Sequence, residues 1–94
     1  MPASSSISPD RIAALLSAER ERFAARNPQS RQLADSAAKH WLRGVPMHWM
    51  VDWGTPFPLF IAEARGVTLT DADANIYADF CLGDTGAMFG HSPA

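Results

Sequence analysis

Hydrophobic positions in the first third of the chain follow a helical period. Between residues 8 and 26 the apolar side chains share one helix face: Ile12, Leu15, Leu16 and Phe23. The segment opens with Ser8, Pro9 and Asp10, which supply a hydroxyl cap, a first-turn proline and a first-turn acid. Proline disfavours the helical conformation in the residue before it, so Asn27-Pro28 should end this helix.

A second amphipathic segment follows, and we expect its helix to start at Ser30. Its apolar stripe consists of Leu33, Ala34, Ala37, Trp41 and Leu42. Gly44 is suited to a C-terminal cap, and Pro46 follows it. The two helices could form a hairpin that binds a partner. Such stripes usually pack on their own protein, and we favour that simpler interpretation.

The helical period disappears in the aromatic loop, which we define as residues 44–58 (GVPMHWMVDWGTPFP). Prolines and a glycine punctuate the loop, but it is too aromatic for a flexible linker, which predicts an ordered loop. Hydrophobic residues make up 47% of the chain, and much of this apolar weight lies between Trp41 and Phe60. The loop covers either the core of this domain or another domain or subunit. We favour the second, because the neighbouring elements are too few to bury it.

Three short apolar runs separated by turn residues follow the loop. We expect strands at residues 59–64 (LFIAEA), 67–70 (VTLT) and 76–80 (IYADF). Arg65-Gly66 and residues 71–75 (DADAN) supply the turns between them. The sequence therefore predicts an α+β fragment with two N-terminal helices, an ordered aromatic loop and a small antiparallel three-stranded meander.

Composition excludes several classes of function. The chain has 94 residues, a formal net charge of −2 and no basic stripe, so nucleic acid is not an expected partner. Its one cysteine, Cys81, allows no internal disulfide and suits a reducing compartment. Residues 1–7 are small and polar, so we expect a disordered tail rather than a secretory signal. No apolar run is long enough to span a membrane, and we expect a cytoplasmic protein.

A calcium loop and a metal site both fail on residue spacing. Asp71, Asp73 and Asn75 stand at the first liganding positions of a calcium loop, but Ile76 and Leu82 replace its required glycine and glutamate. A turn between strands is the better interpretation. The histidines match no standard metal site and should be surface or hydrogen-bonded residues: His40, His48 and His91.

Neither a nucleotide site nor covalent catalysis is supported by the sequence. The glycine-containing loop at residues 83–90 (GDTGAMFG) lacks the Lys-Ser or Lys-Thr pair of a Walker loop. No Ser or Cys stands in a nucleophile-elbow context. The single lysine, Lys39, falls in the second predicted helix, so the chain has no strand-end lysine for Schiff-base chemistry. We expect no catalytic residue within the chain.

Three features occur in order between Gly44 and Pro93. A glycine after the second helix leads into PFPLFIAEARG, which is followed by GVTLTDADANIYADF and then by GHSP. In these features the chain resembles the N-terminal part of class-III pyridoxal-phosphate-dependent aminotransferases, nearest to their glutamate-1-semialdehyde 2,1-aminomutase-like branch. Ala74 stands where the family usually has a glycine in its D-x-D-G turn. We expect Asn75 to supply the left-handed conformation there instead.

The resemblance implies that residues 8–94 are the N-terminal segment of a larger α/β transferase of fold type I, which transfers or shifts an amino group. It implies a pyridoxal 5'-phosphate cofactor held by a lysine downstream of this sequence. It also implies a small amino-acid-like or amino-aldehyde substrate and a homodimer. The chain of 94 residues should be inactive by itself.

By the same resemblance, five residues line the substrate entrance: Met47, His48, Trp49, Asp84 and Thr85. His48 falls near a position where related enzymes can hold the substrate carboxylate with arginine, and imidazole is a weaker, pH-dependent partner. Asp84 would favour an amine-bearing or cationic group, or it would simply cap the next turn. The alternative function is a stand-alone interaction module that docks through the Trp-rich loop.

Overall fold

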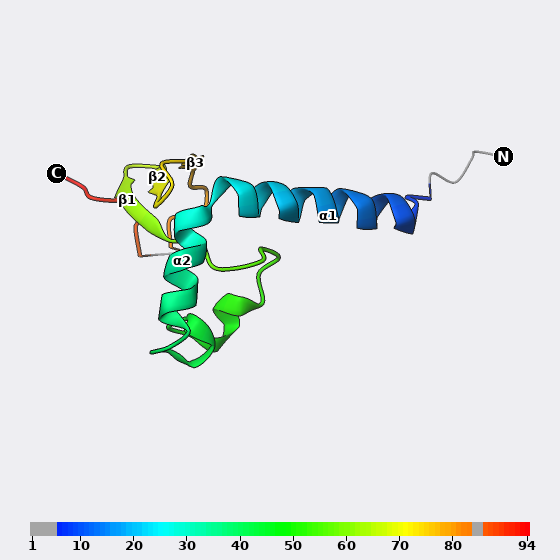
Figure 1. The fold of residues 1–94 in the computed structure, drawn as a ribbon. Coiled ribbons are helices and arrows are strands. Elements are labelled where there is room, and N and C mark those ends of the chain that lie inside the picture. Colours follow the sequence, from blue (N-terminus) through cyan, green and yellow to red (C-terminus); the bar gives the residue numbers. More distant parts are fainter. Residues whose placement is uncertain (1–5, 84–85) are drawn as a thin grey trace.

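The computed structural model describes residues 6–83 and 86–94 and has the predicted α+β architecture. A long helix leads into a second helix, a loop that turns back, and a small sheet that lies far from the start of α1 (Figure 1). The elements are α1 (Pro9–Arg26), α2 (Pro28–Ala37), the 3₁₀ turns η1 (Leu42–Gly44) and η2 (His48–Val51), β1 (Ile61–Arg65), β2 (Thr68–Asp71) and β3 (Ile76–Ala78). Within the described ranges, no helix is long and apolar enough to cross a lipid bilayer.

Helix α1 begins and ends where the sequence predicts. The Ser8 hydroxyl accepts a hydrogen bond from the Arg11 backbone N–H at 3.4 Å, and Pro9 occupies the first turn. Asp10 lies near the positive end of the helix dipole and Arg26 near the negative end, and both placements are favourable. The helix projects away from the sheet (Figure 1). Three side chains of its predicted apolar stripe are exposed: Ile12, Leu15 and Leu16.

Helix α2 differs from the prediction at both ends. It begins at Pro28 rather than at Ser30. Proline suits the first helical position, because the backbone N–H that it lacks would have no acceptor within the helix. It ends at Ala37, well before Gly44, because the chain folds back against the helix end. Gly44 ends η1 instead, and a Cβ on it would lie only 3.3 Å from the Ala38 backbone nitrogen.

The three strands form the predicted antiparallel meander, in the order β1-β2-β3. Ala64 pairs with Leu69, and Leu69 pairs in turn with Tyr77. The ladder between β1 and β2 is irregular between Ile61 and Glu63. The strand ends differ from the predicted runs by no more than two residues. The alternation of turn residues and apolar runs was therefore enough to predict this sheet.

The turn between β2 and β3 contradicts one prediction. Ala74, not Asn75, adopts the left-handed conformation, with φ 66°. The Asp71 carboxylate accepts the backbone N–H groups of Asp73 and Asn75, both at 2.9 Å. These bonds fix the backbone on either side of residue 74, which therefore takes the left-handed position although it carries a Cβ. The Asn75 side chain instead forms hydrogen bonds to the junction between α1 and α2.

A cluster of polar side chains, which we call the polar hub, joins the helices to the sheet. It consists of Asn27, Ser30, Asp71, Asp73, Asn75 and Tyr77. The Asn75 side chain donates to the Arg26 carbonyl at 3.0 Å and to the Asn27 side-chain oxygen at 3.2 Å. The Asp73 carboxylate accepts two backbone N–H groups at the start of α2, at 2.9 and 3.2 Å. A residue of the sheet turn thus caps the helix.

Asp71 lies at the centre of the hub and is only 1% exposed. Its carboxylate accepts a hydrogen bond from the Tyr77 hydroxyl at 2.7 Å. Burial alone would raise the pKa of Asp71, but hydrogen bonds from Tyr77, Asn75 and Asp73 outweigh it and hold that pKa below its ordinary value. Because the pKa is lower in the folded state, the stabilisation is present at neutral pH. It is lost on acidification below about pH 4.

The described residues bury very little hydrophobic surface. Val45 is the one hydrophobic side chain among them that is buried, whereas Phe80 and Phe89 are 97% and 91% exposed. The accessible surface is 7656 Å², against roughly 5,300 Å² for a compact chain of this mass. The radius of gyration is 16.9 Å, against about 12 Å for a compact domain of this length. These values show that the chain is extended and does not enclose a compact apolar core of its own.

The hub should respond to loss of its central carboxylate. In Asp71→Ala, the backbone N–H groups of Asp73 and Asn75 lose their acceptor, and the local opening free energy should fall by about 2–4 kcal/mol. Amide hydrogen exchange at those two positions measures this change. Asp35→Ala removes an exposed carboxylate from α2 and is the matched control. It should change the local opening free energy by less than about 0.5 kcal/mol. Unchanged exchange in Asp71→Ala would contradict the role of the hub.

Candidate functional site

Three of the five predicted site residues lie together on the surface. Met47, His48 and Trp49 stand at the start of η2 and are exposed. They line a hollow of about 400 Å³, which we call the Trp49 hollow. Its other lining residues are Leu42, Val45 and Pro46. Asp84 and Thr85, the other two predicted residues, lie outside the residues that the structure describes.

Two left-handed residues give the hollow its shape. Arg43 and Gly44 have φ values of 57° and 73°, which reverse the chain after α2. Val45 follows in an extended, buried conformation and leads into η2. There the Met50 N–H donates to the Met47 carbonyl at 3.0 Å. A left-handed backbone disfavours any residue with a Cβ, so Arg43 is a strained position beside the site.

Aromatic contacts hold the aromatic loop in place. The rings of Trp49 and Trp53 lie 5.8 Å apart at a tilt of 52°, a favourable geometry for an aromatic pair. Phe57 packs against Phe23 of α1 at 4.9 Å between ring centroids, and the Arg31 guanidinium of α2 lies over the Phe57 ring. The loop is therefore anchored to both helices, which agrees with the ordered loop that its composition predicted.

A second, larger hollow of about 520 Å³ lies between the helices and the aromatic loop, and we call it the Trp41 hollow. Its aromatic walls are Phe23, Trp41, Trp53 and Phe60. Val45 and Pro46 line both hollows, so the two share a wall. The Trp41 hollow is suited to apolar groups and offers no charged side chain among its described lining residues.

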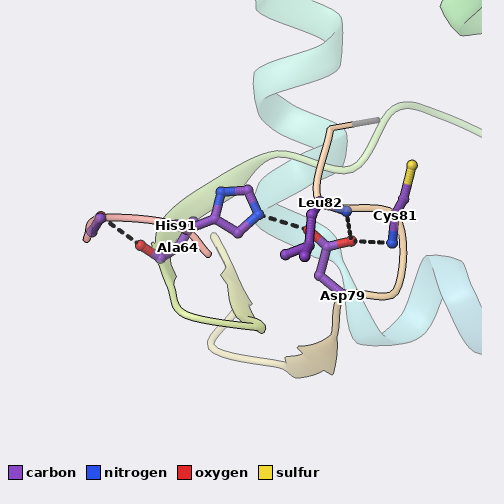
Figure 2. Close-up of polar contacts among 6 residues, drawn as sticks. Ala64, Asp79, Cys81, Leu82 and His91 are labelled. Carbon is purple, nitrogen blue, oxygen red and sulfur yellow. Dashed lines mark hydrogen bonds and ion pairs between the residues drawn. The ribbon is translucent and has the colours of Figure 1, made fainter. Parts of the chain in front are cut away.

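The carboxylate of Asp79 holds both ends of the glycine-containing loop (Figure 2). Its Oδ1 accepts the backbone N–H groups of Cys81 and Leu82, both at 2.9 Å. Its Oδ2 lies 2.7 Å from Nε2 of His91 at the far end of the loop. The His91 backbone also exchanges two hydrogen bonds with Gly66, both at 2.9 Å. We call these contacts the Asp79 clasp.

The clasp stabilises an ionised carboxylate and a tightly bent backbone. The hydrogen bond with His91 lowers the pKa of Asp79, the turn N–H groups add to this effect, and partial burial opposes it. The loop closes on Gly90, which has φ 86°. A Cβ there would lie 3.1 Å from the Cα of Gly66, so this position needs glycine for both its conformation and its packing.

Sequence analysis did not single out Asp79. The available signals were an acid at the end of the third strand, in YAD, and a histidine in the closing GHSP. Twelve residues separate Asp79 from His91, and no local pattern shows that such a pair is in contact. The sequence predicted that each histidine is either a surface residue or a hydrogen-bonded one, and His91 is hydrogen-bonded. In the described part of the chain, no group of three His, Cys, Asp or Glu side chains could hold a metal ion.

Known proteins resemble this chain in both sequence and fold. It is 37% identical over 65 residues to glutamate-1-semialdehyde 2,1-aminomutase of Thermoplasma volcanium, covering 67% of this chain and 14% of that protein. It is 38% identical over 71 residues to β-phenylalanine transaminase of Variovorax paradoxus, covering 76% of this chain and 16% of that protein. No protein-family model matches the chain.

A solved structure covers more of the chain. A glutamate-1-semialdehyde aminomutase from Pseudomonas aeruginosa PAO1, in complex with PMP, matches with a TM-score of 0.85 and 43% identity, over 92% of this chain and 19% of that one. In sequence and in fold, the chain is similar to these glutamate-1-semialdehyde aminomutases and also to the β-phenylalanine transaminase. It spans only 14% to 19% of the length of these proteins.

The one lysine of the chain lies away from both hollows. This lysine, Lys39, is exposed in the turn after α2. Lys39 lines neither the Trp49 hollow nor the Trp41 hollow. Covalent attachment of the cofactor needs a lysine amine beside the substrate site. Lys39 is therefore not placed to attach the cofactor at either hollow.

The Asp79 clasp predicts a titration shift. In His91→Ala, the pKa of Asp79 should rise toward its ordinary value, because the hydrogen bond that lowers it most is lost. NMR titration of the Asp79 carboxyl carbon measures this pKa. His48→Ala, the control, removes a histidine of the aromatic loop and should leave the pKa of Asp79 unchanged. If both variants behave alike, His91 is not the partner that stabilises the carboxylate.

Proposed function

We propose that this chain is the N-terminal segment of a pyridoxal-phosphate-dependent aminotransferase or aminomutase, and that the Trp49 hollow lines its substrate entrance. The match to an aminomutase solved with PMP supports this proposal most directly. The names of the relatives point to two kinds of substrate, an amino aldehyde and a β-amino acid. The proposed substrate is accordingly a small amino-acid-like or amino-aldehyde compound.

In this proposal the chain supplies substrate contacts only. Met47, His48 and Trp49 present two apolar side chains and one imidazole to the substrate. Asp84 and Thr85 are proposed to contact it as well, and a carboxylate at position 84 would attract an amine-bearing or cationic group. Pyridoxal phosphate, when bound, supplies the electron sink for amino-group chemistry. We propose that a lysine beyond residue 94 holds it.

The Trp41 hollow and its surrounding apolar side chains would pack against the cofactor-binding part of the same protein. The chain exposes roughly 2,300 Å² more than a compact chain of its mass. Permanent interfaces bury about 2,000–5,000 Å² summed over both partners, so one side of such an interface could account for this excess. We propose that the full-length protein is a cytoplasmic homodimer. A stand-alone interaction module is the competing function, because exposed tryptophans such as Trp53 would also serve as docking residues.

Cofactor binding should require sequence beyond this segment. The chain of 94 residues, mixed with pyridoxal phosphate, should show no visible absorbance band of lysine-bound cofactor, because Lys39 lies outside both hollows. The protein made from its complete reading frame should show that band and should transfer or shift an amino group. A stable yellow complex with the short chain would contradict the proposal. A natural stop codon after Ala94, together with a well-folded monomer, would support the interaction module.

Tryptophan shielding should distinguish the two functions independently of the cofactor. In the isolated chain, acrylamide should quench Trp41 and Trp53 strongly, because the two side chains are 50% and 64% exposed. In the full-length protein the same residues should be shielded by the part that covers them. Single Trp→Phe variants assign the signal to each position. The enzyme proposal fails if the isolated chain melts cooperatively with its tryptophans already protected.

A further inference from the structure

The glycine-containing loop is enclosed by a ring of hydrogen bonds that begins and ends at Asp79. One oxygen of the Asp79 carboxylate accepts the Leu82 backbone N–H at 2.9 Å. The Leu82 carbonyl accepts the Ala87 N–H at 3.0 Å, and the Ala87 carbonyl accepts the Gly90 N–H at 2.9 Å. The His91 ring then returns to the other carboxylate oxygen, with Nε2 at 2.7 Å from Oδ2 (Figure 2). The two ends of the loop therefore meet on a single side chain.

We infer that Asp79 and His91 are positioning residues for the proposed amino-group reaction. Neither side chain needs to touch the substrate. Their contact holds the glycine-containing loop in the conformation that takes part in substrate binding. The inference rests on the proposed function, in which this loop contributes to the substrate entrance, and it adds two residues that act through the loop.

Backbone strain at both ends of the loop is the reason that the Asp79 clasp is needed. Leu82 and Ser92 have φ values of 51° and 49°, in the left-handed region that disfavours a Cβ. Asp79 holds the first of these residues through its N–H. The Ser92 hydroxyl donates to the Ala64 carbonyl at 2.8 Å and holds the second. Strained residues of this kind persist only where surrounding contacts fix them, and they concentrate at binding and catalytic sites.

The contact between His91 and Asp79 is sheltered and directional. The two side chains are 23% and 11% exposed. An ionised carboxylate can only accept hydrogen bonds, so Nε2 of His91 carries the proton that joins the two groups. The His91 backbone is fixed as well, by two hydrogen bonds with Gly66 at 2.9 Å. The clasp therefore ties the end of β3 to the turn between β1 and β2, with the loop held between them.

Loss of this contact should weaken substrate binding before it slows the reaction at saturating substrate. If only a fraction of the molecules holds the loop in the binding conformation, the apparent dissociation constant rises by the inverse of that fraction. Bound substrate restores the conformation, so kcat changes little. Removing a hydrogen bond to a charged group is enough to lower the correctly held fraction to about one tenth.

The test uses the protein expressed from its complete reading frame and loaded with pyridoxal phosphate. The probe amine is 3-amino-3-phenylpropanoate or 4-amino-5-oxopentanoate, whichever the wild-type protein converts faster, so that both proposed kinds of substrate are tried. His91→Phe keeps a ring but has no donor, and it should raise KM about tenfold while kcat changes by less than about twofold. His91→Gln places an amide N–H near the position of Nε2 and should bring KM back to within about threefold of the wild-type value.

Two further variants make the test independent of general damage to the protein. His40→Phe makes the same substitution at an exposed histidine in the turn after α2, and it should leave both constants unchanged. Ser92→Ala removes only the hydroxyl bond to the Ala64 carbonyl, and it should raise KM by about threefold. Ser92→Ala takes the place of His91→Phe if that variant does not fold.

The outcomes separate this inference from the proposed function. If the loaded wild-type protein converts neither amine, the proposed function fails, and the inference fails with it. If the protein is active, a fall in kcat at unchanged KM in His91→Phe means that His91 only maintains folded protein, which overturns the inference alone. A KM for His91→Gln as high as that for His91→Phe, or an unchanged KM in Ser92→Ala where it takes that place, overturns it as well. A raised KM in His91→Phe that His91→Gln restores supports the inference.

Discussion

The fold depends on two carboxylates, one at the end of β2 and one in the turn that follows it. Asp71 is buried and accepts hydrogen bonds from its own turn and from Tyr77, while Asp73 caps the start of α2. Together they join a helix junction to a turn that lies more than forty residues away in sequence. Because the described residues bury almost no hydrophobic side chain, these charge-assisted bonds supply order that an apolar core would supply in a typical small domain.

The position of the candidate site follows from this hub. The Ser30 hydroxyl, at the start of α2, accepts the backbone N–H of Phe60 at 3.1 Å, which fixes the exit of the aromatic loop beside the helix. Phe57 is anchored to α1 a few residues earlier. At the other end of the sheet, the Asp79 clasp returns the glycine-containing loop to Gly66. The sheet is thus a small frame from which the aromatic loop and the glycine-containing loop extend.

The arrangement of polar and apolar groups is the reverse of that in an independent globular domain. Among the described residues, three of the buried side chains are polar and only Val45 is hydrophobic, while large apolar side chains such as Phe80, Met88 and Trp53 are exposed. Exposed apolar surface on this scale marks an interaction surface rather than a solvated one. The family match agrees with this view, because the chain corresponds to less than a fifth of the solved aminomutase it resembles.

Local chemistry in the sequence was sufficient to predict the start and end of α1 and the order and direction of the three strands. Each depends on residues close together in the chain, such as the Ser8 cap or the alternation of strand and turn. The left-handed backbone at Ala74, the early end of α2 and the pairing of Asp79 with His91 were decided by tertiary structure. In each case the partner lies on another element or across a loop, so hydrogen bonding and close packing between distant segments outweighed the local preference of the residue.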